Sequence, residues 1–281
     1  MSPTATALRA GVTRGLIELR QSLTGAGLAG HLFWPVVTLV AIFFLRDRGF
    51  GASGFTLGTL ALPGVLGMFI ALGMLLVVQY LSAEREDGTL LRAKAIPNGI
   101  RGYFIGKLVT VSGTILAYLA ILLIPGLVIV DGLDVGSIGS WLTLGWVLLV
   151  GLVATQSLGA MLGALISSPR GAGYISLPVM GLIAISGIFY PITALPGWLQ
   201  GIAQAFPMYW LGLGMRSALL PDGAVSVEIG GSWRHLETAG VLGAWAVLGL
   251  IVAPIVLRRM ARRESGARVA ERREKLLQRI G

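Results

Sequence analysis

The charged residues of the chain are confined to short clusters, and six long stretches between them contain no Asp, Glu, Lys or Arg. These stretches are residues 21–45, 49–83, 108–130, 135–169, 171–215 and 238–257. A transmembrane helix needs about 20 predominantly apolar residues, and a charge at the bilayer centre is costly. The pattern therefore predicts an all-α polytopic membrane protein.

The composition agrees with a membrane location. Hydrophobic residues make up 55% of the 281 residues and charged residues only 12%, and the mean hydropathy is +0.81. A soluble domain carries about twice that charged share, mostly on its surface. The chain contains no cysteine, which excludes thiolate catalysis, cysteine-ligated zinc, iron–sulfur clusters and disulfide bonds.

Glycine and polar clusters within the longer stretches indicate where the predicted helices end. We predict six transmembrane helices, at about 28–45, 57–81, 105–129, 141–167, 172–190 and 238–257. The stretch 171–215 is long enough for two spans. Two spans there would give seven helices in total and would place the two chain ends on opposite sides of the membrane.

The distribution of Lys and Arg distinguishes these two topologies, because loops rich in basic residues stay on the cytoplasmic side. With six spans, 18 of the 22 basic residues share the side of the chain ends. The other side holds only Arg46, Arg48, Arg216 and Arg234. Six spans with cytoplasmic N- and C-termini therefore fit the charges better than seven.

In the six-span topology, residues 191–212 follow the fifth span on the outer side. Proline breaks a continuous helix, and Trp and Tyr favour the headgroup level of the bilayer. The segment combines both kinds of residue, namely Pro191, Pro196, Trp198, Pro207, Tyr209 and Trp210. We therefore predict short interfacial or re-entrant helices here.

Both chain ends are predicted to lie at the inner membrane surface. Residues 8–24 form an amphipathic pattern, which predicts a helix on the inner leaflet; a frayed tail is the alternative. Its apolar positions are Leu8, Val12, Leu16, Leu19 and Leu23. Residues 258–281 contain nine Lys or Arg residues, which favours contact with anionic lipid. Nucleic-acid binding is disfavoured there, because no aromatic residue lies among these charges.

Few residues of the predicted spans can carry chemistry. His31 and His235 begin different spans and have no ligand partners nearby in sequence, which argues against a metal site. An ion-coupled carrier or a membrane enzyme needs ionisable groups inside the bundle. Gly106-Lys107 is followed by Leu108, so the phosphate-binding pattern G-x-x-x-x-G-K-[ST] is not met. We expect no cofactor on this chain and no ATP hydrolysis by it.

The loop after the second span is the most informative hydrophilic segment. It reads Glu84, Arg85, Glu86, Asp87, Gly88, Thr89, Leu90 and Leu91. Gly88 permits a turn, and Thr89 can cap a short helix. Leu90 and Leu91 would form an apolar knob surrounded by charges, which suits docking to a soluble partner. The alternative is an ordinary solvated loop.

Two parts of the chain resemble the ABC-2 type transporter permeases. Residues 84–90, with Pro97 and Gly106-Lys107, are similar to the E-R-E-x-G-T-L…P…G-K pattern of that family. Residues 186–216 are similar to its pattern S-G-x-F-x-P…L-P-x-W-L-x…N-P…x-R. Phe206 stands where the family often has Asn, which puts the polar contact of that Asn in question.

The resemblance implies the membrane half of an exporter, formed by a single domain over residues 1–281. Two permease subunits, identical or different, would lie side by side, and two separate ABC subunits would bind ATP and Mg²⁺. Residues 84–95 would be the coupling helix that contacts an ABC subunit, 8–24 the connecting helix and 191–212 the outer helices.

The resemblance also implies that the second and fifth spans line the substrate pathway. Methionine, aromatic and aliphatic side chains accommodate varied apolar shapes. The candidate contacts of this kind are Met68, Phe69, Met74, Tyr174, Met180, Ile183 and Phe189. Plain helix packing is the alternative for each of them.

The expected function is export of an apolar or amphipathic compound, such as a drug or antibiotic, across the bacterial cytoplasmic membrane. This expectation follows from the absence of charge in the implied pathway and from the short outer loops. Export of a lipid or a lipid-linked glycan is the alternative within the family. Membrane lipids are expected as further partners, and nucleic acid is not.

Overall fold

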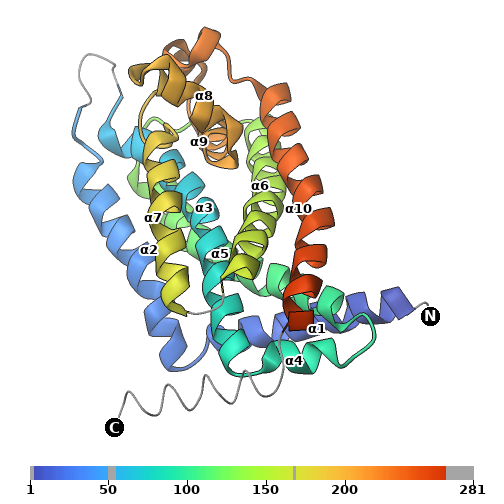
Figure 1. The fold of residues 1–281 in the computed structure, drawn as a ribbon. Helices are drawn as coiled ribbons and strands as arrows, with labels where there is room; N and C mark the ends of the chain where they lie inside the picture. Colours follow the sequence, from blue (N-terminus) through green and yellow to red (C-terminus); the bar gives the residue numbers. More distant parts are fainter. Residues whose placement is uncertain (1–2, 50–54, 167–168, 264–281) are drawn as a thin grey trace.

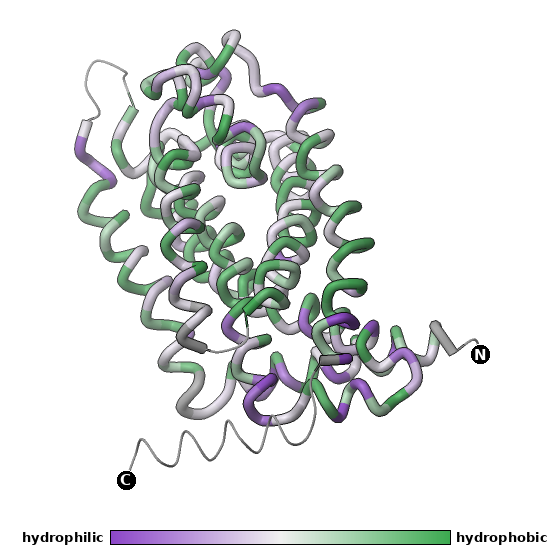
Figure 2. Tube along the Cα trace, in the orientation of Figure 1, coloured by the Kyte–Doolittle hydropathy of each residue, from purple (hydrophilic) through white to green (hydrophobic). Residues whose placement is uncertain are grey.

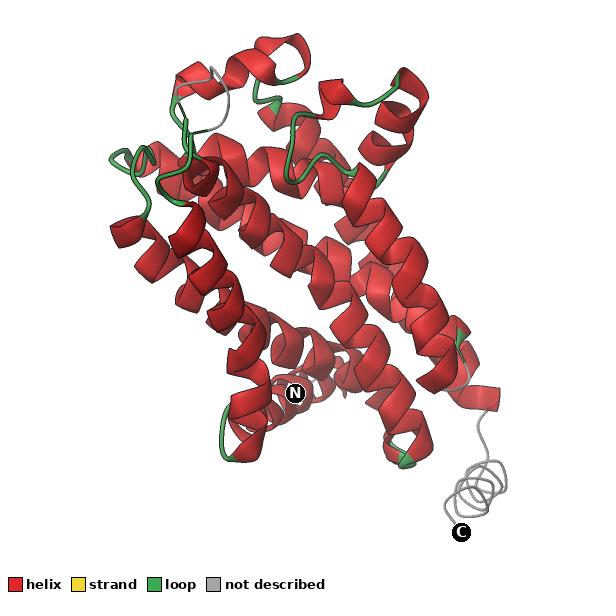
Figure 3. Ribbon diagram, turned by 90° about the vertical axis from the view of Figure 1, so that its left-hand side faces the viewer, coloured by secondary structure: helices red, strands yellow, loops and turns green. Residues whose placement is uncertain are grey.

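The computed structural model describes residues 3–49, 55–166 and 169–263. Within these ranges the chain is helical and has no strand beyond one isolated bridge, between Gly49 and Thr56 (Figure 3). The α-helices are α1 (Pro3–Ser22), α2 (Ala26–Leu45), α3 (Leu57–Glu86), α4 (Thr89–Lys94), α5 (Gly99–Ile129), α6 (Ile138–Leu165), α7 (Pro169–Ile185), α8 (Gly197–Ala205), α9 (Pro207–Leu219) and α10 (His235–Arg263). The 3₁₀ helices are η1 (Ile192–Ala194), η2 (Asp222–Val227) and η3 (Ile229–Gly231).

The long helices form a bundle with two distinct ends (Figure 1). At one end, which we call the α4 end, α1 and α4 lie across the bundle, and α10 terminates beside them. At the other, the α8 end, α8 and α9 follow α7. Hydrophobic residues dominate the length of the bundle, and hydrophilic residues gather towards both ends (Figure 2). This distribution is that of a protein whose middle lies in lipid.

Five helices of the described ranges are long and apolar enough to cross a membrane, namely α2, α3, α5, α6 and α10. They coincide with the predicted spans 28–45, 57–81, 105–129, 141–167 and 238–257, so five of the six predicted spans are confirmed as long apolar helices. α3 and α5 extend beyond the predicted ends, to Glu86 and from Gly99. Charged residues stop a span at the membrane surface, but they do not stop a helix.

The predicted fifth span, 172–190, corresponds to α7, which has only 17 residues and ends at Ile185. The helix ends there because of local hydrogen bonds and backbone geometry. The Ser186 hydroxyl donates to the carbonyl of Ile183 (2.6 Å) and accepts from the amide of Ile188 (3.3 Å). Gly187 then adopts a left-handed conformation, with φ 66°, that favours glycine. The chain therefore turns before the predicted end of the span.

The segment 191–212 forms η1, α8 and the first part of α9. Each of its prolines stands where a helix starts: Pro191 and Pro196 precede η1 and α8, and Pro207 is the first residue of α9. Proline is tolerated there because the first turn of a helix has no intrahelical acceptor for its N–H groups. The prolines thus divide this segment into short helices. The basic tail beyond residue 263 lies outside the described residues.

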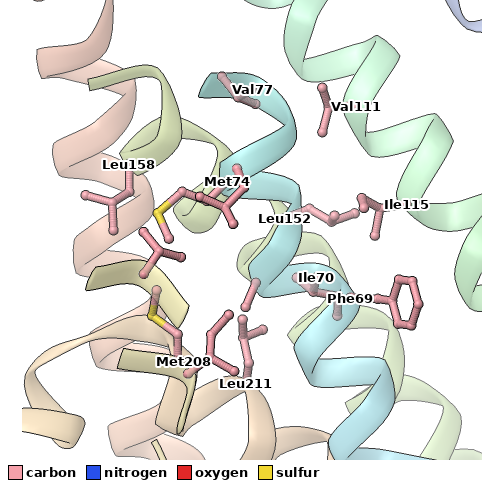
Figure 4. Close-up of a cluster of buried hydrophobic side chains, with 14 of the residues drawn as sticks. Phe69, Ile70, Met74, Val77, Val111, Ile115, Leu152, Leu158, Met208 and Leu211 are labelled. Atoms are coloured by element: carbon pink, nitrogen blue, oxygen red, sulfur yellow. The ribbon is translucent and has the colours of Figure 1, made fainter. Parts of the chain in front are cut away.

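The core is built around α3, whose side chains pack in all directions against α5, α6 and α9 (Figure 4). Phe69 and Ile115 meet on the α5 side of this helix, and Met74 points to the opposite side with Leu158 and Met208. α3 is accordingly apolar around its whole circumference, as a central buried helix must be.

Candidate functional site

A cavity of about 610 Å³ lies between α2, α3, α5 and α7. Its wall consists of Gly30, His31, Trp34, Thr38, Met68, Phe69, Leu72, Leu75, Leu76, Gln79, Ile115, Tyr118 and Met180. None of these residues is Asp, Glu, Lys or Arg, and most are apolar. The size and the composition are those of a small-molecule binding site.

Polar side chains interrupt the apolar wall of this cavity. The Nδ1 atom of His31 on α2 is hydrogen-bonded to the Tyr118 hydroxyl on α5. The ring of Phe69 packs edge-on against Tyr118, with 5.7 Å between the ring centroids. Gln79 adds an amide. The wall therefore suits a molecule with an apolar body and an uncharged hydrogen-bonding group.

The polar residues of the wall were not among the candidates taken from the sequence. The sequence places His31 at the start of a span without a ligand partner, and it gives no reason to select Tyr118 or Gln79. One signal was available, since His31, Trp34 and Thr38 recur at helical spacing on one face of an otherwise apolar span.

Three of the seven predicted pathway residues lie in the cavity wall, namely Met68, Phe69 and Met180. Met74 and Ile183 are instead buried in helix packing, with 0% and 4% of their surface exposed. Met74 faces α6, where a Cβ on Gly159 would collide with the Met74 backbone. Met74 and Ile183 therefore lie in plain helix packing, which is the sequence-based alternative to a substrate contact.

The other two predicted pathway residues lie outside the cavity. Tyr174 is largely exposed on the surface of α7. Phe189 follows α7 and lines a second, smaller cavity of about 280 Å³ at the α8 end, together with Pro191, Arg216 and Glu228. The structure therefore divides the predicted pathway between two cavities, the helix packing and the surface of α7.

Arg216 organises the α8 end. Its Nε atom donates to Oε1 of Glu228 at 2.7 Å, and its Nη1 atom donates to the carbonyls of Gly187 (2.9 Å) and Ile188 (3.1 Å). Both charged side chains are almost completely buried. The arginine thereby ties the turn after α7 to α9 and η2. Trp198 of the same sequence pattern lies on the exposed face of α8.

At the α4 end, one part of the prediction for residues 84–95 is wrong, because Leu90 does not belong to an exposed apolar knob. Leu90 is 1% exposed, because α4 packs its apolar side against α3, α5 and α10. Leu91 is half-buried, and the surface of the segment carries Arg92, Lys94 and Ile96. A partner that docks here would meet basic residues and Ile96 rather than Leu90.

The cap of α4 also differs from the prediction. Gly88 precedes the helix in a left-handed conformation, with φ 77°, and Thr89 is the first helical residue. The Asp87 carboxylate accepts a hydrogen bond from the Thr89 amide at 2.8 Å. Asp87 thus caps the helix, and the Thr89 hydroxyl accepts a hydrogen bond from Arg92 instead.

Lys107 joins three helices just above α4. Its ammonium group forms ion pairs with Glu18 of α1 and Glu84 of α3, and it lies 5.0 Å from the centre of the Tyr80 ring. Only 4% of the lysine side chain is exposed. Glu84 and Gly106-Lys107, which belong to the first family-like pattern, are therefore parts of one buried charge cluster.

Glu18 stays ionised in this cluster. Burial alone would raise the pKa of its carboxyl, but hydrogen bonds from Lys107 and Arg14 outweigh burial and hold that pKa below its ordinary value. Among residues 3–49, 55–166 and 169–263, no three His, Asp or Glu side chains gather in a way that could hold a metal ion.

Four glycines bring α1 against α5. Gly11 and Gly15 of α1 face Gly102 and Gly106 of α5, and a Cβ at Gly102 would lie 2.9 Å from the carbonyl oxygen of Ala7. The Thr110 hydroxyl donates to the carbonyl of Gly15 at 3.1 Å. Small residues with this spacing allow helices to pack backbone to backbone. The glycine face of α1 is therefore turned inward, and Leu8 and Leu16 are exposed.

Comparison with known families identifies the chain. The family model described as ABC-2 family transporter protein matches residues 48–255, which is well over half of the chain. A search of curated proteins finds no match. The matched region includes the parts of the cavity wall on α3, α5 and α7, the Lys107–Glu84 ion pair and the Arg216 turn. The chain belongs to the ABC-2 family of transporters and is a multi-pass membrane component of such a transporter.

Proposed function

We propose that this chain is the permease subunit of an ATP-driven exporter of an apolar or amphipathic compound in the bacterial cytoplasmic membrane. The cavity between α2, α3, α5 and α7 carries the proposal, because its wall is uncharged and mostly apolar. A compound with an apolar body and an amide, hydroxyl or ether group fits this chemistry. Export of a lipid or a lipid-linked glycan is the rival activity.

The proposal includes six spans, with α7 as the short fifth span and the α4 end in the cytoplasm. Two copies of the permease, or this chain and a related one, pair in the membrane. Each docks through the surface of α4 to an ABC subunit, and the two ABC subunits bind ATP and Mg²⁺. Membership of the ABC-2 family supports the ABC partner. The exposed Arg92, Lys94 and Ile96 support the docking surface.

The test is reconstitution of the full chain with its ABC subunit in liposomes. ATP hydrolysis is measured while a panel of amphipathic compounds and lipid-linked glycans is added. We expect stimulation by amphipathic compounds that carry no charge. Failure of the chain to associate with any ABC subunit would refute the transporter assignment, and stimulation by glycans alone would refute the substrate class.

A substitution in the cavity makes the proposal specific. Tyr118→Phe removes the hydroxyl that contacts His31 and leaves the ring in place. In the proposal this hydroxyl also hydrogen-bonds the substrate. Loss of one such bond costs about 1 kcal/mol of binding, so the substrate concentration that half-stimulates ATP hydrolysis should rise about fivefold. Tyr174→Phe removes a hydroxyl from an exposed position and is the matched control. Equal responses of the two variants would contradict the cavity assignment.

A further inference from the structure

A third cavity lies between α5 and α10 and shares no residue with the proposed substrate site. It is a groove of about 470 Å³. Phe104, Ile105, Leu250, Ile251, Pro254 and Ile255 give it apolar walls. Phe104 is buried, whereas Ile251 and Ile255 are 60% and 47% exposed. The groove is therefore open to the surroundings of the bundle along α10.

The order of its residues along α5 and α10 gives the groove a basic end and an apolar end. Ile251, Ile255 and Arg258 follow one face of α10 at intervals of a helical turn, and Arg101 begins the facing stretch of α5. α5 starts at the α4 end and α10 terminates there. Both arginines consequently lie at the α4 end of the groove, and the apolar residues lead from them towards the middle of the bundle.

The two arginines have no acidic partner in the part of the chain that the structure describes. The ion pairs found there involve Arg14, Arg46, Lys107, Arg216 and Arg234 as the basic residues. Two guanidinium groups without an acidic partner among the described residues thus stand at the end of an apolar groove. Hydrophilic residues collect at the same level of the bundle (Figure 2), where lipid headgroups lie in a membrane.

We propose that this groove binds one anionic phospholipid from the leaflet at the α4 end. The guanidinium groups of Arg101 and Arg258 donate hydrogen bonds to the phosphate, and an acyl chain lies along Ile251 and Ile255. Guanidinium groups bind phosphate with several charge-assisted hydrogen bonds, and basic pockets between membrane helices recognise anionic headgroups in this way. A transmembrane helix in the groove would instead bury two unpaired charges, which is costly.

Native mass spectrometry of the full chain tests the site. The protein is purified from nanodiscs that contain phosphatidylcholine and phosphatidylglycerol in equal amounts, and retained lipids are counted. We expect one retained phosphatidylglycerol per chain. The variant Arg101→Gln/Arg258→Gln should bind it about thirtyfold more weakly, since each basic residue near the headgroups contributes about a factor of five. Arg259→Gln is the matched control, because Arg259 neighbours Arg258 but is exposed outside the groove.

A second variant separates the acyl-chain contact from the charges. Ile255→Trp fills the groove, keeps both arginines and should also lose the bound lipid. Equal retention by wild type and the double variant would overturn the site, as would equal retention of the two lipids. Displacement by soluble glycerol 3-phosphate would overturn the role of the apolar groove. The readout does not involve ATP hydrolysis, so its outcome is independent of the proposed export activity.

Discussion

Lys107 is the residue on which the packing of the α4 end depends most. It is a cation with 4% of its side chain exposed, and its charge is compensated by Glu18 and Glu84 on two other helices. Removing one member of a buried ion pair leaves its partner charged and desolvated. The free energy lost in this way is larger than the net stabilisation that the intact pair provides. Substitution of Lys107 should therefore be far more damaging than substitution of an exposed base.

We predict that Lys107→Met destabilises the protein by about 3–5 kcal/mol. The reason is that Glu84 loses the counter-charge of Lys107 in a buried position, and Glu18 keeps only Arg14 as a partner. Thermal unfolding of the purified protein, followed by circular dichroism, measures the effect. Arg20→Gln, at an exposed position of α1, is the control and should unfold with the wild type.

The triple variant Lys107→Met/Glu18→Gln/Glu84→Gln should recover much of this loss. It removes Lys107 together with both of its carboxylate partners and leaves Arg14, whose side chain is 40% exposed. Uncharged replacements of buried ion pairs are often neutral in stability. A Lys107→Met protein that melts at the wild-type temperature would show that the cluster is solvated.

The residue contacts were the part of the site least predictable from the sequence. Gly106-Lys107 and Glu84 stood out as parts of a pattern, but Glu18 lies 89 residues before Lys107 and nothing local connects them. The sequence predicts an exposed Leu90 because charged residues lie on both sides of it, at Asp87 and Arg92. Whether an apolar residue of a short helix faces in or out depends on which helices lie beneath it, and a local pattern does not contain that information.

Among the elements, the contact between α1 and α5 is sensitive to small changes in volume. Gly11, Gly15, Gly102 and Gly106 form it, and backbone atoms rather than flexible side chains oppose each of them across the contact. Gly15 additionally faces Val109. Backbone cannot rotate away from an added methyl group, so a larger residue must separate the helices.

We predict that Gly102→Val loosens α1 by about 1–3 kcal/mol, because its Cβ would lie 2.9 Å from the carbonyl oxygen of Ala7. Trypsin cleavage after Arg9, Arg14 and Arg20 reports the loosening and should become roughly tenfold faster. Gly145→Ala on α6 meets no atom within 4 Å and should leave the cleavage rate unchanged. Slow cleavage of both variants would mean that the glycine contact does not hold α1.

The sequence predicted the elements better than their contacts. Long charge-free stretches fix where a helix can lie in lipid, and five predicted spans coincide with long apolar helices. The ends were less predictable, because α3 and α5 continue through charged residues that lie outside the apolar layer. The early end of α7 depends on a hydrogen-bonded turn at Ser186 and Gly187, which hydropathy does not register.

For the whole molecule, the orientation in the membrane is the property to establish next. The distribution of basic residues predicts that the α4 end is cytoplasmic. α10 terminates at that end beside α4, where the Lys94 ammonium group donates to the carbonyl of Arg262 (3.5 Å). Whichever side receives α4 therefore also receives the end of α10.

The absence of cysteine makes this orientation directly measurable, because any introduced cysteine is the only thiol of the chain. We predict that Ala194→Cys in η1 reacts with a membrane-impermeant maleimide in intact cells. Ala95→Cys and Arg262→Cys, at exposed positions of the α4 end, should react only after the cells are permeabilised. Reaction of Arg262→Cys in intact cells would contradict cytoplasmic termini.

The packing of α1 also has a consequence for the order of biosynthesis. α1 is made before α5, but the lysine and the glycines that hold it belong to α5, and Lys107 is translated 89 residues after Glu18. At about 5–20 residues per second, the helix waits roughly 5 to 20 seconds for its binding surface. During that interval the leucines that remain exposed in the finished protein can hold the nascent helix on the lipid surface. The α1 helix thus reaches its final contacts only after α2, α3, α4 and the first part of α5 have been synthesised.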